Sequence, residues 1–208
     1  FPAIPYILMG HSMGSFLARS YAGRDGRDFE AYIFSGTAGK NPMLGIAKFL
    51  ARREIKKHGA ETPSDLLYNL SFGSYNKAFR PNRTAFDWLS RDDEQVDKYV
   101  SDELCGFPFS AGAMLDLFNG LSEISSINWA RRLPDRPILL LSGACDPVGG
   151  AGNGVKQVFG WIKKSGRNAE CKLYEGGRHE MLNEINREEV YRDILLFIDT
   201  VEALGERA

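Results

Sequence analysis

The sequence predicts an α/β fold in which a mostly parallel sheet has flanking helices and carries an inserted helical cap. Residues 6–9 and 137–143 are apolar runs without alternation, which is typical of strands buried on both faces of a parallel sheet. Residues 38–133 show a pattern of short helices with no convincing strand, and this stretch is too long for a simple crossover. We therefore expect a core of residues 1–37 and 134–208 and a helical cap of residues 38–133.

The first predicted strand runs directly into Gly10-His11-Ser12-Met13-Gly14, a Gly-x-Ser-x-Gly sequence, and helical spacing of apolar residues follows it. Strand, tight turn and helix form the context of a nucleophile elbow, in which a strained turn exposes a serine hydroxyl. Gly10 and Gly14 are expected where a side chain would collide with the adjoining strand and helix. We predict Ser12 as the nucleophile and the backbone N–H of Met13 as an oxyanion donor. A surface Gly-Ser turn is the alternative, because short patterns also recur by chance.

The remaining elements of the predicted core alternate between strands and helices. Strands are expected at residues 29–34 and 170–175, and helices at 155–164 and 189–204. In the cap, residues 46–57 form an amphipathic helix with a solvated basic face, and Ser90 and Ser110 are expected to cap the helices that follow them. Most aromatic side chains of the cap should form its own core, and some should line a pocket.

Composition restricts the classes of function. The 208 residues carry a net charge of −1, whereas a nucleic-acid binder normally shows a basic excess. No apolar run is long enough to span a bilayer, and residues 1–9 lack the basic region of a signal peptide. Cys105, Cys145 and Cys171 fit neither a disulfide framework nor a zinc site, and we expect buried free thiols. The sequence therefore predicts a cytoplasmic protein without nucleic-acid partners and with at most peripheral membrane contact.

A nucleophilic serine needs a base, normally a histidine whose tautomer is fixed by a buried carboxylate. His11 lies inside the elbow and His58 ends a basic helix, whereas His179 lies in a Gly-rich loop after the last strand and is free to reach over the sheet. Asp146 directly follows the strand at 137–143, and the carboxyl ends of parallel strands meet at one edge. Taken singly, Asp146 also fits a turn-forming Asp-Pro and His179 a solvent loop. The order Ser12, Asp146, His179 is that of the α/β-hydrolase fold.

Four segments also carry a family resemblance, namely residues 10–15, 142–149, 178–184 and, in the cap, 86–92. The chain resembles α/β-hydrolases of the serine aminopeptidase S33 or monoacylglycerol lipase and lysophospholipase group, and the cap segment is similar to bacterial members. The resemblance implies Ser12 as nucleophile, Asp146 as orienting acid, His179 as base and the Met13 N–H as one oxyanion donor. It implies no metal and no organic cofactor.

The start of the chain departs from this family. Its members carry several strands before the elbow, including a His-Gly loop whose N–H supplies a second oxyanion donor, and residues 1–5 hold none of these. The resemblance therefore implies a fragment of a longer hydrolase that lacks its N-terminal strands.

The residues and the resemblance together predict a serine hydrolase that cleaves small carboxylic esters of apolar acyl groups, such as a monoglyceride or lysophospholipid. The first alternative is an aminopeptidase with a carboxylate cluster for the amino group of its substrate. Asp92, Asp93 and Glu94 cluster, although a helix start explains them better. The second alternative is a truncated, catalytically silent chain that binds a ligand or partner.

Overall fold

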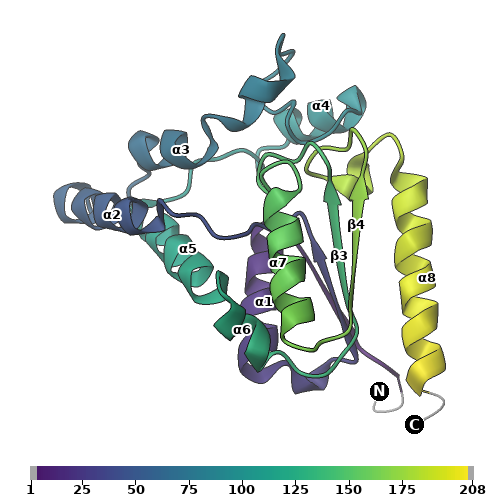
Figure 1. Ribbon diagram of the computed structural model, residues 1–208. Coiled ribbons are helices and arrows are strands. Elements are labelled where there is room, and N and C mark those ends of the chain that lie inside the picture. Colours follow the sequence, from purple (N-terminus) through teal and green to yellow (C-terminus); the bar gives the residue numbers. More distant parts are fainter. Residues whose placement is uncertain (1–3, 206–208) are drawn as a thin grey trace.

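The computed structural model describes residues 4–205 and shows a parallel sheet with helices on both faces (Figure 1). The ends of the predicted core, residues 1–3 and 206–208, lie outside the described residues. The strands are β1 (Ile7–His11), β2 (Ala31–Ser35), β3 (Ile138–Gly143) and β4 (Ala169–Tyr174), all parallel and in the spatial order β1-β2-β3-β4. The α-helices are α1 (Met13–Asp25), α2 (Leu44–His58), α3 (Asp65–Phe72), α4 (Asp93–Ser101), α5 (Ala111–Ile124), α6 (Ile127–Arg132), α7 (Asn153–Lys164) and α8 (Arg187–Gly205). Short 3-10 turns lie at Gly26–Asp28, Tyr75–Phe79 and Met181–Asn183.

Apolar side chains of the sheet pack into one layer of helices on each face. On one face, Phe34 and Leu140 pack with α1, α6 and α7, with Trp129 of α6 among the largest fully buried side chains. On the other face, Ile33 and Leu141 pack with Val190 and other residues of α8, which stands alone beside the sheet in Figure 1. Both faces of the central strands are thus removed from water, which is the main stabilising contribution to such a fold.

The burial of the strands confirms the prediction for β3 and contradicts it for β1. Every residue of β3 is buried, as its unalternating apolar run predicted, and every residue of β2, for which only a strand was predicted, is buried as well. Most of β1 is only half-buried, although residues 6–9 were expected to form a strand buried on both faces. The reason is its position, because β1 lies at the edge of the described sheet and pairs only with β2.

Five helices, α2 to α6, lie between β2 and β3 in the chain. In Figure 1, α3 and α4 lie beyond the carboxyl ends of the strands. Leu44 and Ala51 of α2, Leu67 of α3 and Met114 and Phe118 of α5 form a separate apolar cluster. The division of the chain into a core and a cap of residues 38–133 stays a prediction.

Helix capping in this region follows the prediction at Ser110 and departs from it at Ser90. The Ser110 hydroxyl accepts the backbone N–H of Ala113 and opens α5. At α4 the cap is Asp92, whose carboxylate accepts the N–H groups of Glu94 and Gln95. Serine and aspartate are comparable N-caps, so the local sequence does not choose between them.

The expectations about cysteines and membrane spans have different outcomes. All three cysteines are free thiols, but none is fully buried, and Cys145 is exposed. Cys145 lies in the loop after β3, which ends at Gly143, and is therefore outside the packed strands. Within residues 4–205, no helix combines the length and the apolar character that crossing a bilayer requires.

The junction of β1 and α1 gives opposite roles to its two glycines. A Cβ on Gly10 would lie 2.3 Å from the carbonyl oxygen of Gly14 and 2.9 Å from the Ala18 side chain, as expected for a close approach of strand and helix. A Cβ on Gly14 would meet nothing within 4 Å, so the expected collision there is wrong. Gly10 is required by packing, and Gly14 is not.

We predict that Gly10→Ala lowers the free energy of unfolding by about 1–3 kcal/mol, because the added methyl group overpacks the junction. Gly14→Ala is the matched control, and it should leave stability unchanged or raise it by up to about 1 kcal/mol, since alanine favours the helix. Urea unfolding followed by circular dichroism measures both values. Equal effects of the two substitutions would contradict the packing argument.

Candidate active site

Ser12 occupies a strained turn between β1 and α1. Its φ and ψ angles are 53° and −122°, in a region that residues other than glycine rarely adopt. The Ser12 N–H donates to the carbonyl oxygen of Ser35 at 2.9 Å, which fastens the turn to the end of β2. The Ser15 hydroxyl donates to the Ser12 carbonyl oxygen at 2.6 Å. The structure therefore has the strand, strained turn and helix that the sequence predicted.

Met13 is the first residue of α1, and its side chain is 43% exposed. The N–H groups of a first helical turn have no acceptor within their own helix and lie at the positive end of its dipole. The Met13 N–H is thus suited to a developing negative charge beside Ser12, and its role as oxyanion donor stays a prediction.

Asp146 and His179, predicted as acid and base, are in direct contact. His179 Nδ1 lies 3.0 Å from Asp146 Oδ2, and both residues are almost completely buried. The Asp146 carboxylate also accepts the Val148 N–H at 2.9 Å and the Ser142 hydroxyl at 3.2 Å. Because a carboxylate accepts hydrogen bonds, this contact places the imidazole proton on Nδ1 and leaves Nε2 free to accept a proton.

The loops that carry these two residues approach each other closely. The N–H groups of Ala144 and Cys145 donate to the carbonyl oxygens of Tyr174 and Gly177 at 2.8 and 2.9 Å. A Cβ on Gly143 would lie about 2.1 Å from the carbonyl oxygen of Arg178, so only glycine fits at this end of β3. The parallel neighbours β3 and β4 therefore bring Asp146 and His179 together through backbone contacts that begin at the last residues of both strands.

Two rings that the sequence analysis did not assign to the site surround His179. The His11 ring centroid lies 4.7 Å from that of His179, and the Trp88 ring centroid lies 5.1 Å from it. The sequence analysis set His11 aside as a base and did not predict that its ring would pack against the ring of His179, at an interplanar angle of 46°. Trp88 belongs to the segment 86–92 that carried the family resemblance, which was the available signal. Among the hydrogen bonds of residues 4–205, none joins the Ser12 hydroxyl to His179.

Burial and neighbouring charges shift two ionisable groups here. Burial, together with the nearby His179, lowers the pKa of His11 from 6.5 to about 4, against a smaller opposing effect of Asp146. His11 Nδ1 lies 3.2 Å from the Ser35 hydroxyl. Burial, together with the charge of Asp146, raises the pKa of Tyr75 to about 12. Both groups are therefore neutral near pH 7.

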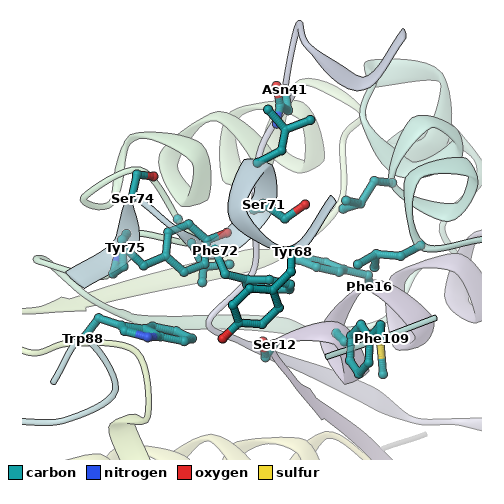
Figure 2. A pocket seen from close by; sticks show the side chains of 18 of the residues that line it. Ser12, Phe16, Asn41, Tyr68, Ser71, Phe72, Ser74, Tyr75, Trp88 and Phe109 are labelled. Carbon is teal, nitrogen blue, oxygen red and sulfur yellow. The ribbon is translucent and has the colours of Figure 1, made fainter. Parts of the chain in front are cut away.

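A pocket of about 730 Å³ opens beside Ser12, between the core and the cap (Figure 2). This volume lies in the range of small-molecule sites, which are mostly apolar with a few polar groups. Its wall follows that description. Figure 2 shows aromatic rings of the cap around the space beside Ser12; the lining includes Phe16, Tyr68, Phe72, Tyr75, Trp88, Phe107, Phe109, Leu117 and Leu121, with Asn41, Ser71 and Ser74 as polar members.

The carboxylates considered for an amino-group site are engaged elsewhere. Asp92 caps α4 and lies 2.8 Å from Arg187, whereas Asp93 and Glu94 form ion pairs with Arg83 at 3.3 Å and Lys98 at 3.1 Å. Across residues 4–205, no three side chains of histidine, cysteine, aspartate or glutamate lie together as a metal ion would require.

Comparison with known proteins finds a family model and relatives that are named as monoacylglycerol or monoglyceride lipases. A family model described as serine aminopeptidase, S33, matches residues 1–186. The monoacylglycerol lipase of Mycolicibacterium smegmatis is 26% identical over 95% of this chain and 63% of that protein. The human monoglyceride lipase is 28% identical over 89% of this chain and 54% of that protein. The chain thus covers between about half and about two thirds of the length of these relatives.

A solved structure confirms the predicted fold class. The thermostable carboxyl esterase of Bacillus coagulans, crystallised with glycerol, superposes with a TM-score of 0.90 at 29% identity. The match covers 96% of this chain and 66% of that one. The parallel sheet with flanking helices is that of the α/β-hydrolases.

The lowered pKa of His11 predicts a dependence of stability on pH. Since the unfolded chain binds a proton at His11 below about pH 6.5 and the folded chain only below about pH 4, stability is present above pH 6.5 and is lost as pH falls toward 4. The contribution is about 3 kcal/mol at most. His11→Gln should reduce the loss of unfolding free energy between pH 7 and pH 4.5, measured by urea titration. His58→Gln, at an exposed position, is the control; an unchanged pH dependence in His11→Gln would refute the assignment.

Proposed function

The chain belongs to the serine aminopeptidase S33 family, and from this premise we propose that it is a serine hydrolase that cleaves carboxylic esters of apolar acyl groups, such as monoglycerides or lysophospholipids. One observation carries the proposal. The buried Asp146–His179 hydrogen bond lies at the same edge of the sheet as the strained Ser12 turn, and Ser12 lines a largely apolar pocket. The relatives named as monoglyceride lipases support this substrate class.

The proposed acylation step uses the free Nε2 of His179. This nitrogen takes the proton of the Ser12 hydroxyl while the Ser12 Oγ attacks the carbonyl carbon of the ester. The negative charge that develops on the carbonyl oxygen is stabilised by the Met13 N–H. The tetrahedral intermediate collapses, His179 protonates the departing alcohol, and the acyl group stays on Ser12 as an ester.

Deacylation repeats the same chemistry with water in place of the serine hydroxyl. His179 takes a proton from a water molecule, whose oxygen attacks the acyl carbonyl carbon, and the proton then returns to the Ser12 Oγ as the free acid leaves. Asp146 stays ionised in both steps and stabilises the imidazolium ion that forms in each.

The pocket wall supports an apolar acyl group as the part of the substrate that is bound. Tyr68, Phe72 and Phe109 are among the aromatic side chains beside Ser12, and burying acyl methylene groups against them contributes about 0.8 kcal/mol per group. The carboxylates that an aminopeptidase would use for an amino group are instead occupied by a helix start and by arginine and lysine side chains.

We predict that Ser12→Ala lowers the rate of p-nitrophenyl ester hydrolysis by at least about 10⁴-fold, because the nucleophile is removed. The same substitution should abolish labelling by a fluorophosphonate probe. Ser101→Ala, an exposed serine at the end of α4, is the control and should retain both.

Three outcomes distinguish the candidate functions. Ester hydrolysis and labelling that depend on Ser12 agree with the proposal. Faster turnover of an aminoacyl anilide than of the ester would favour the aminopeptidase, and a wild-type chain that is neither labelled nor active would favour a silent binding protein.

The pocket also predicts a change in acyl-chain preference. Leu117 of α5 lines the pocket, and Leu117→Trp should fill part of it. Loss of room for about two buried methylenes corresponds to about a tenfold fall in kcat/KM for p-nitrophenyl decanoate relative to the butyrate. Asn119→Trp, at an exposed position of the same helix, should leave the ratio unchanged. An unchanged ratio in Leu117→Trp would show that the acyl chain lies elsewhere.

A further inference from the structure

A segment of the cap lies directly against the loop that carries His179. The His179 N–H donates to the carbonyl oxygen of Trp88 at 3.4 Å, and the Glu180 N–H donates to that of Leu89 at 2.8 Å. The Trp88 ring contacts the His179 ring, at 5.1 Å between centroids. Trp88 also lines the pocket, as Figure 2 shows. The proposed base therefore takes part of its support from the cap as well as from the sheet.

Glu184 joins these two segments through a single buried carboxylate. Its side chain is fully buried, and Oε1 accepts the backbone N–H of Arg178 at 2.9 Å and that of Arg91 at 3.2 Å. Oε2 accepts the Arg91 Nε–H at 2.9 Å and the Ile185 N–H at 3.0 Å. One of these donors is the residue next to His179, and two belong to the cap segment that reaches His179.

Further hydrogen bonds join the cap segment to the loop that carries His179, with donors on both segments. Arg178 Nη1 donates to the carbonyl oxygens of Asp87 and Ser90, the latter at 2.9 Å. The Ser90 hydroxyl donates to the carbonyl oxygen of Asn183 at 2.9 Å and accepts the Asp92 N–H at 2.9 Å. Arg91 Nη2 donates to Asn186 Oδ1 at 2.9 Å. Residues 87–91 and 178–186 are thus bonded along their length, with the Glu184 carboxylate at the centre.

A buried carboxylate is costly unless donors surround it, and removing its partners or its charge disturbs the segments that supply them. The chemistry of Ser12, Asp146 and His179 makes no direct use of Glu184, which lies five residues beyond His179. Its four donors nevertheless come from the two segments that hold the imidazole. Small displacements of a catalytic group are enough to lower a rate strongly.

We infer that Glu184 is a positioning residue that holds the His179 imidazole between the cap segment 87–91 and Asp146; this inference rests on the proposed function. The carboxylate fixes the backbone on both sides of His179 and fixes Trp88 against its ring. Because Trp88 also lines the pocket, the same contact sets the base relative to the bound acyl group.

The test replaces Glu184 by glutamine, which keeps the shape but turns one acceptor atom into a donor that faces other donors. In Glu184→Gln we expect kcat for a p-nitrophenyl ester to fall about 10-fold to 100-fold, while KM changes by less than about twofold because Glu184 itself does not line the pocket. Fluorophosphonate labelling should slow by the same factor as kcat. Glu188→Gln makes the same chemical change at an exposed position of α8 and should match the wild type.

A second measurement separates positioning from stability. The proton in the Asp146–His179 hydrogen bond should give a downfield NMR signal in the wild type, and this signal should broaden or move upfield in folded Glu184→Gln. A purely structural role would lower the unfolding temperature while leaving the signal and kcat of the folded protein unchanged. That result would overturn the inference.

Arg91→Lys covers the case in which Glu184→Gln does not fold. The Arg91 side chain is 26% exposed, and lysine keeps its charge while losing the Nε–H and Nη2 contacts. We expect a smaller fall in kcat, severalfold, with the same change in the NMR signal, and wild-type behaviour would count against the inference. If the wild type shows neither labelling nor turnover, the proposed function fails, while the NMR comparison still decides whether Glu184 positions His179.

Discussion

The common direction of the four strands is the constraint on which the rest of the structure depends. In a parallel sheet the carboxyl ends of all strands lie at one edge. Ser12 follows β1, Asp146 follows β3, and the loop after β4 returns His179 to the same edge. The backbone bonds between the ends of β3 and β4 then bring the carboxylate and the imidazole to 3.0 Å. No local sequence pattern brings Asp146 and His179 together, whereas the order and common direction of β3 and β4 do so.

The site also contains the features that lower the stability of the fold locally, namely a strained backbone and buried carboxylates. The backbone of Ser12 is strained, at a cost of about 1–3 kcal/mol for such a conformation. Asp146 and Glu184 are fully buried carboxylates, which are costly without donors. Each cost is offset nearby, by the bond of the Ser12 N–H to β2, and by backbone and side-chain donors at both carboxylates. Because these donors come from neighbouring loops, the hydrogen bonds that stabilise the site also hold the loops against one another.

The sequence predicted the structure well where the pattern of apolar residues within a segment decides whether that segment is buried. The unalternating apolar run at residues 137–143 predicted β3. The position of Asp146 directly after this strand predicted it as a site residue. The half-burial of β1 was missed because it depends on what lies beside the strand, which the strand's own residues do not specify. The tilted ring contacts of His11 and Trp88 with His179 were missed for a similar reason, since the partners are far apart in the chain and no periodicity links them. Capping by Asp92 in place of Ser90 shows the same limit on a smaller scale. Both side chains can cap, but α4 begins at Asp93, directly after Asp92, and the Ser90 hydroxyl accepts the Asp92 N–H while it donates to the carbonyl oxygen of Asn183.

The pocket and the proposed base are therefore not independent parts of the molecule. Trp88 faces the pocket and also contacts the imidazole, and its segment is bonded to the loop of His179. By contrast, Leu117 reaches the pocket from α5, whose packing partners are α1 and α2. Under the proposed function, a change on the α5 side alters the space for an acyl chain, whereas a change in the segment of Trp88 alters both that space and the position of the proposed base. Selectivity and rate would then be coupled at Trp88 and separable at Leu117, because within residues 4–205 the segment of Trp88 is hydrogen-bonded to the loop that carries His179 and α5 is not.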